Sequence, residues 1–166
     1  MSGLKNLILI TIAALTVALD QATKSWIVAH MSLGESREVA PWLNAIFSLT
    51  YVTNTGIAFG LFQGLGDVLL IVALLAVGAM FIYYRHLPPG PLLLPIALGL
   101  QLGGALGNLI DRLTRGAVVD FIDLNFWPLH HWPIFNLADA SIVTGVALLV
   151  LMILSKKDRR EPLAPT

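Results

Sequence analysis

Residues 107–139 read GNLIDRLTRGAVVDFIDLNFWPLHHWPIFNLAD, and this stretch decides how the rest of the chain is interpreted. It begins at the end of one long apolar segment, which finishes with Asp111 and Arg112, and it closes at the start of another, which opens with Asp139. Carboxylates at the ends of membrane helices are costly and therefore point to pairing or to function. The stretch predicts two membrane helices joined by a polar, functional junction.

Composition places the chain among membrane proteins. It has 166 residues, of which 57% are hydrophobic and only 12% are charged, and its mean hydropathy is +0.80. Soluble domains are about one quarter charged. The formal net charge is +0 and no basic, aromatic stripe is present, so no nucleic-acid partner is expected. Cysteine is absent, which excludes disulfides, thiolate nucleophiles and cysteine-ligated zinc.

Four apolar segments are long enough to cross a bilayer. They predict an all-α membrane protein whose helices cover about residues 4–29, 68–84, 92–113 and 135–154. The first segment follows Lys5 and resembles a signal peptide, but it lacks a clean small-x-small site, so we interpret it as a membrane helix. We expect one integral membrane domain over residues 1–166, with a flexible tail at about 156–166.

Two polar regions separate the helices, and the first of them predicts a small lobe outside the membrane. In residues 30–66, the alternating, β-rich run 47–52 predicts a strand, and the sequence Asn54-Thr55-Gly56 predicts a turn after it. The following run 57–65 is too short to span. Residues 114–133 are predicted to be a second polar loop, whose tryptophans suggest a membrane interface.

Basic residues predict the orientation. An even number of spans puts both termini on one side, and that side carries Lys5, Arg85 and the basic cluster at 156–160. By the positive-inside rule this side is cytoplasmic, so the lobe at 30–66 and the loop at 114–133 are extracytoplasmic. Asp20 lies about 24 Å along the first helix, at 1.5 Å per residue, in the outer third of a bilayer core about 30 Å thick. The polar residues therefore converge at the outer surface.

Two carboxylates in this polar layer suggest hydrolytic chemistry. Asp120 stands between Val119 and Phe121, and Asp139 occupies the first turns of the last helix. Two carboxyls against an apolar wall can share one proton, so that one activates water and the other protonates the reacting group. This is the chemistry of aspartyl peptide hydrolysis, and it requires neither a metal nor a cofactor. Asp123 competes for the role of Asp120, and spacing alone does not choose between them.

Other interpretations of these residues are structural or belong to other classes of protein. Asp111 and Arg112 suit a structural clasp, and Asn136 has the position of a helix N-cap three residues before Asp139. HExxH and GxSxG motifs are absent, and the adjacent histidines 130 and 131 suit an interface better than a metal. A proton-coupled transporter would place carboxylates at several depths. A non-catalytic scaffold would tolerate the loss of Asp120 and Asp139.

Five motifs in order resemble bacterial lipoprotein signal peptidases, also called signal peptidase II, over about residues 4–155. They are DQATK at 20–24, NTGIAFG at 54–60, GNLIDR at 107–112, VVDF at 118–121 and FNLAD at 135–139. The resemblance implies an aspartyl endopeptidase with Asp120, rather than Asp123, paired with Asp139. It implies substrate-binding or supporting roles for Asn54, Gly56, Asn108, Asp111, Arg112 and Asn136, and a structural role for Asp20 and Lys24.

The resemblance also implies the substrate and the location. Such enzymes remove the signal peptide from prolipoproteins that carry diacylglycerol on a cysteine, and they cut just before that cysteine. They are multi-pass proteins of the bacterial inner membrane, with the active site at the periplasmic face, and globomycin-type cyclic peptides inhibit them. We expect a monomer that contacts membrane lipid and needs no metal or cofactor.

Overall fold

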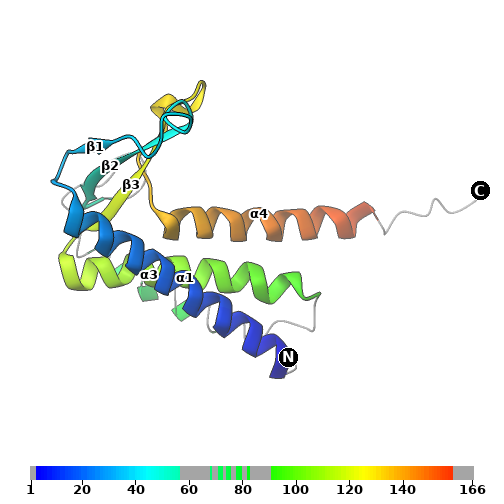
Figure 1. Ribbon diagram of the computed structural model, residues 1–166. Helices are drawn as coiled ribbons and strands as arrows, with labels where there is room; N and C mark the ends of the chain where they lie inside the picture. Colours follow the sequence, from blue (N-terminus) through cyan, green and yellow to red (C-terminus); the bar gives the residue numbers. More distant parts are fainter. Residues whose placement is uncertain are drawn as a thin grey trace, which may run out of the picture.

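The computed structural model describes residues 3–56, isolated positions between 68 and 82, and residues 91–158. Three long helices and a small sheet make up this part of the chain (Figure 1). The apolar run 57–65, the predicted helix 68–84 as a continuous element, the loop around Arg85 and the tail beyond residue 158 lie outside the described residues.

The three helices are α1 (Gly3–His30), α3 (Leu93–Arg115) and α4 (Leu137–Asp158). Each contains a segment long and apolar enough to cross a membrane, with mean hydropathy of 1.6, 1.6 and 2.4 respectively. They confirm three of the four predicted helices to within a few residues. α3 ends where Gly116 adopts a left-handed conformation with φ of 75°, the usual glycine stop of a helix.

Small residues let α3 pack closely between α1 and α4 (Figure 1). A Cβ added at Gly103 would lie 2.6 Å from the Cβ of Thr16 on α1. A Cβ added at Gly104 would run into the backbone oxygen of Ala138 on α4. Neighbouring glycines thus face opposite partners, and van der Waals contact between closely spaced backbones holds the bundle together.

The sheet contains β1 (Ser36–Arg37), β2 (Phe47–Asn54) and β3 (Val118–Leu124), in the antiparallel order β1-β2-β3. β2 confirms the predicted strand and extends it by two residues. β3 corrects one prediction, since residues 118–124 form a strand rather than part of a loop. The mostly helical fold with a small sheet agrees with the predicted helical membrane protein that carries a β-containing lobe. The two polar regions form one lobe because they share this sheet.

The sheet is anchored to the bundle where α1 and α3 end and α4 begins (Figure 1). A buried cluster joins the last turns of α1 to the inner face of β3, through Ile27, Met31, Val119 and Phe121. The pairing of Val52 with Asp120 fixes the height of Asp120 on the sheet. Side chains from α1, β2, β3, α3 and α4 therefore meet at one end of the molecule.

Candidate active site

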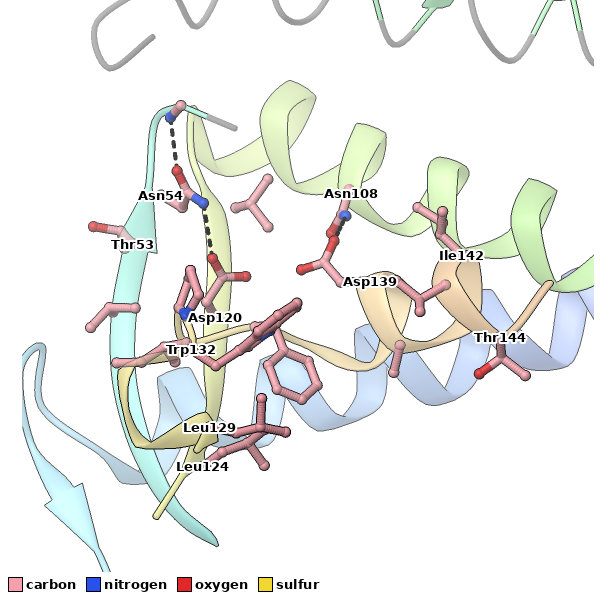
Figure 2. Close-up of a pocket in the computed structure, with 18 of the residues that line it drawn as sticks. Thr53, Asn54, Asn108, Asp120, Leu124, Leu129, Trp132, Asp139, Ile142 and Thr144 are labelled. Carbon is pink, nitrogen blue, oxygen red and sulfur yellow. Dashed lines mark hydrogen bonds between the residues drawn. The ribbon is translucent and has the colours of Figure 1, made fainter. Parts of the chain in front are cut away.

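Asp120 is held at this end by strand pairing and by two amide side chains. It lies in β3 and is only 2% exposed. Asn136 donates from Nδ2 to Asp120 Oδ1 at 2.6 Å, and Asn54 donates from Nδ2 to Oδ2 at 3.1 Å. Both carboxylate oxygens therefore accept an N–H, and the carboxyl has a fixed orientation toward the cavity (Figure 2).

Asp139 lies in the first turn of α4 and shares a reciprocal cap with Asn136. The backbone N–H of Asp139 donates to Asn136 Oδ1 at 2.9 Å, and the backbone N–H of Asn136 reaches Asp139 Oδ2 at 3.4 Å. The first of these bonds confirms the N-cap position predicted for Asn136. Capping is only part of the role of Asp139, because Asn108 also donates from Nδ2 to its Oδ1 at 2.7 Å.

The two carboxyls point toward one another across the polar end of a cavity (Figure 2). Burial is the main cause that raises the pKa of Asp120, and the charge of Asp139 raises it further, to about 7. The hydrogen bonds from Asn54 and Asn136, together with the charge of Lys24, act in the opposite direction. Near neutral pH the pair can therefore hold one proton, which is the state that acid–base catalysis by two carboxyls requires.

The cavity has a volume of about 830 Å³, with a polar end and a long apolar wall. Arg112 lines the polar end, where its Nη2 donates to the backbone oxygen of Gly56 at 3.1 Å. The apolar wall comes from the lobe and from α4, and includes Leu124, Leu129, Trp132, Phe135, Ile142 and Val143. A cavity of this size and lining suits an extended apolar ligand with one polar group at the carboxyls.

A fully buried ion cluster lies beside the carboxyl pair. The Nζ of Lys24 is 2.9 Å from Asp20 Oδ2 and 2.9 Å from Asp111 Oδ2. Asp111 also accepts hydrogen bonds from Arg115 and from the backbone N–H of Val119. The cluster ties α1 to α3 and to the strand that carries Asp120, so it maintains the geometry of the site.

The structure separates some residues that the sequence grouped together. Arg112 lines the cavity, whereas Asp111 lies in the ion cluster and is not among the lining residues. Asp123 faces away from the pair and accepts a hydrogen bond from Thr50 Oγ1 at 2.8 Å. Asn54, Gly56, Asn108, Asp120 and Asp139 all line the cavity, as expected of site residues.

Sequence reasoning missed two features of the site. Lys24 donates from Nζ to Asn108 Oδ1 at 2.8 Å, which links the ion cluster directly to the carboxyl pair. The spacing of Asp20 and Lys24 by four residues is a signal that could have identified their pairing on one helix face, but not this second contact. The second missed feature is the apolar wall of the cavity, because its residues form no sequence motif. Within ranges 3–56 and 91–158, no group of three or more acidic, histidine or cysteine side chains is placed to hold a metal.

Comparisons with known proteins identify the family and agree with the fold. The family model described as signal peptidase (SPase) II matches residues 12–155. The lipoprotein signal peptidase of Moorella thermoacetica is 44% identical over 153 residues, which cover 91% of this chain and 97% of the relative. That of Geobacillus thermodenitrificans is 40% identical over 151 residues, which cover 91% and 92%.

Two solved structures, each titled as a bacterial membrane enzyme studied by the in meso method, have the same fold. The one at 2.3 Å resolution has a TM-score of 0.83 and 33% identity, and the match covers 95% of this chain and 94% of that one. The one at 1.9 Å resolution has a TM-score of 0.76 and 36% identity, and the match covers 88% and 92%. The chain therefore belongs to the signal peptidase II family of aspartic peptidases.

Proposed function

We propose that this peptidase cuts diacylglyceryl-modified prolipoproteins just before the lipid-bearing cysteine, with Asp120 and Asp139 as its catalytic pair. Removal of signal peptides from prolipoproteins is the activity that the family supports. One observation carries the residue assignment: two buried carboxyls from different elements face each other at the polar end of an apolar cavity.

The carboxyl pair contains the groups that peptide hydrolysis needs. One carboxylate takes a proton from water as the water oxygen attacks the carbonyl carbon, and the protonated partner donates its proton to the carbonyl oxygen. The tetrahedral intermediate then collapses, the C–N bond breaks and the amine of the new N-terminal cysteine receives a proton. Because the two carboxyls interact, they titrate as a unit, and each can serve as the acid in one step and the base in another.

Neighbouring groups would hold the substrate and the pair in place. Asn54, Asn108 and Asn136 supply N–H donors to the carboxyls. Arg112 holds the backbone of Gly56 at the edge of the cavity, where the substrate peptide would pass. The apolar wall suits a signal helix and acyl chains, both of which would otherwise lie in lipid.

The membrane arrangement follows from the spans and the charges. We propose four helices, including about 68–84, in one integral domain over residues 1–166, with both termini cytoplasmic and the site at the outer face of the inner membrane. Because the chain has no cysteine, single cysteines can map this topology. A cysteine at Trp127 should react with an impermeant thiol reagent in intact spheroplasts, whereas one at Thr166 should react only after lysis.

The proposal also covers a segment that closes over the substrate, inhibition by cyclic peptides and the oligomeric state. The stretch 35–65 would lie over the bound peptide and limit the access of water to the pair. Globomycin-type cyclic peptides would bind the cavity and compete with substrate. A monomer would suffice, because all the proposed catalytic and supporting groups come from one chain.

The function can be tested by comparing two precursors that differ only in the lipid. Purified full-length protein in detergent should cleave the diacylglyceryl-modified prolipoprotein, and mass spectrometry should find a product that begins with the modified cysteine. The unmodified precursor should be cut far more slowly. Equal cleavage of both precursors, or a product that begins at another residue, would contradict the proposal.

A further inference from the structure

Lys24 occupies the junction between the ion cluster and the carboxyl pair. Its ammonium lies 2.9 Å from Asp20, 2.9 Å from Asp111 and 2.8 Å from Asn108 Oδ1, and its side chain is fully buried. The two carboxylates already neutralise its charge. The contact with Asn108 is therefore not needed for ion pairing, and it connects Lys24 to the proposed catalytic site.

This contact determines which way the Asn108 amide points. An ammonium group has only donors, so the atom of Asn108 that faces Lys24 must be the oxygen. The same oxygen accepts from Asn136 Nδ2 at 3.1 Å. The Asn108 amide nitrogen is therefore directed to the opposite side, where it donates to Asp139 Oδ1 at 2.7 Å. A reversed amide would face N–H against N–H on one side and oxygen against oxygen on the other.

The other two amides at the site are oriented by backbone groups. The N–H of Gly56 donates to Asn54 Oδ1 at 2.9 Å, and the N–H of Asp139 donates to Asn136 Oδ1 at 2.9 Å. Each amide consequently presents its NH₂ group to a catalytic carboxyl. Asn108 differs from the other two because a side-chain cation helps to fix its orientation.

We propose that Lys24 is a positioning residue for catalysis, whose ammonium fixes the Asn108 amide and thereby keeps an N–H donor on Asp139. The proposal rests on the proposed function, in which Asp139 is half of the catalytic pair. It extends the structural role of Lys24, because it connects the ion cluster to the chemistry through one defined amide.

The proposal predicts a specific effect on the pH dependence of cleavage. The charged groups that face or adjoin the carboxyl pair come from four elements: Asp20 and Lys24 on α1, Asp111 and Arg112 on α3, Asp120 on β3, and Asp139 on α4. Loss of Lys24 removes a cation and frees the Asn108 amide. Both changes favour the protonated pair, so the acid limb of the activity profile should move to higher pH.

Lys24→Gln and Arg115→Gln form a matched pair for the test. Both remove one cation from Asp111, but Arg115 donates to Gln21, Asp111 and Ser25 rather than to Asn108. Cleavage of the lipid-modified precursor by the full-length protein in detergent would be followed from about pH 5 to pH 9, with thermal unfolding measured in parallel. We expect Lys24→Gln to lower kcat about tenfold or more, to change KM little, and to move the acid limb upward by roughly half a pH unit or more. Arg115→Gln should leave the acid limb in place.

Asn108→Leu keeps the inference testable if Lys24→Gln fails to fold. It removes the amide donor and retains Lys24, so its acid limb should also move upward. Adding Lys24→Gln to Asn108→Leu should then shift the acid limb less than Lys24→Gln does in the wild type, because only the loss of the cation still contributes. An unmoved acid limb in Asn108→Leu, or equal shifts in Lys24→Gln and Arg115→Gln, would overturn the positioning role.

Asp139→Asn, measured in the same assay, separates the two proposals. If Asp139→Asn cleaves at the wild-type rate, the catalytic pair itself is wrong and the positioning role falls with it. If Asp139→Asn is inactive while Lys24→Gln has the wild-type pH profile, only the positioning role is wrong.

Discussion

Replacing Asp120 with asparagine measures what the burial of this carboxyl costs the fold. Burial, followed by the charge of Asp139, raises the pKa of Asp120 from 3.8 to about 7. Between these two values the folded protein binds more protons than the unfolded chain. The free energy of unfolding therefore falls as the pH rises from about 4 to about 7, and the full cost is present above that range.

The structure gives the size of this effect. At about 1.36 kcal/mol for each pH unit, the rise from 3.8 to about 7 corresponds to a cost on the order of 4 kcal/mol. Asparagine does not titrate in this range. The stability of Asp120→Asn relative to the wild type should consequently increase by up to this amount between pH 4 and pH 8, or roughly 10 °C in Tm for a chain of this length.

Thermal unfolding in detergent, followed by tryptophan fluorescence at pH 4 and pH 8, would measure the difference. Asp123→Asn is the control, since it removes a partly exposed carboxyl from the same strand. Asp120→Asn also weakens the hydrogen bonds from Asn54 and Asn136, but this loss does not depend on pH and would lower Tm equally at pH 4 and pH 8. A Tm difference between Asp120→Asn and wild type that is the same at pH 4 and pH 8, or that falls with pH, would refute the reasoning.

Three further substitutions test the packing and the site. Asp111→Ala should lower the free energy of unfolding by about 3–5 kcal/mol in chemical denaturation, because it removes one of the two carboxylates that pair with the buried Lys24 and also the side-chain acceptor of the Val119 backbone N–H. Gly103→Leu should lower Tm by separating α3 from α1, whereas Gly78→Ala should not, since a Cβ there has nothing within 4 Å among the residues that the structure describes. Arg112→Gln should lower kcat/KM by roughly tenfold or more at an unchanged Tm, because it removes a charged donor to Gly56 at the cavity edge.

Each of these results has a contrary outcome. A small effect of Asp111→Ala would mean that Asp20 alone is enough to stabilise the buried Lys24. Equal Tm values for Gly103→Leu and Gly78→Ala would contradict close packing of α3 on α1. A wild-type kcat/KM for Arg112→Gln would remove Arg112 from the substrate site.

Helix positions were readable from the sequence because their signals are local. Runs of apolar residues mark α1, α3 and α4, and the alternation in Phe47–Val52 marks β2. β3 was missed because its first four residues are all buried, so the alternation that identifies a half-buried strand is absent. Its pairing with β2 joins segments more than sixty residues apart in the chain, for example Val52 with Asp120.

The sequence predicted at which end of the helices the polar residues gather, but not which contacts they make. Counting residues along the helices correctly placed Asp20, Asn108 and Asp139 together at one end of the bundle. The partners of Asp111 and Arg112 were not predictable, because successive helical residues point about 100° apart at 3.6 residues per turn. One side chain consequently enters the ion cluster, and the other enters the cavity.

The most direct test of the proposed catalytic pair is the rate of cleavage of a diacylglyceryl-modified prolipoprotein by wild type, Asp120→Asn and Asp139→Asn, with Asp123→Asn as the control. Each substitution in the pair should lower kcat by roughly a hundredfold or more, as expected for the loss of a general acid or base, while Tm shows that the fold is retained. Asp123→Asn should cleave at close to the wild-type rate, and a metal chelator should have no effect. Undiminished cleavage by Asp120→Asn or Asp139→Asn, or inhibition by the chelator, would contradict catalysis by these two carboxyls.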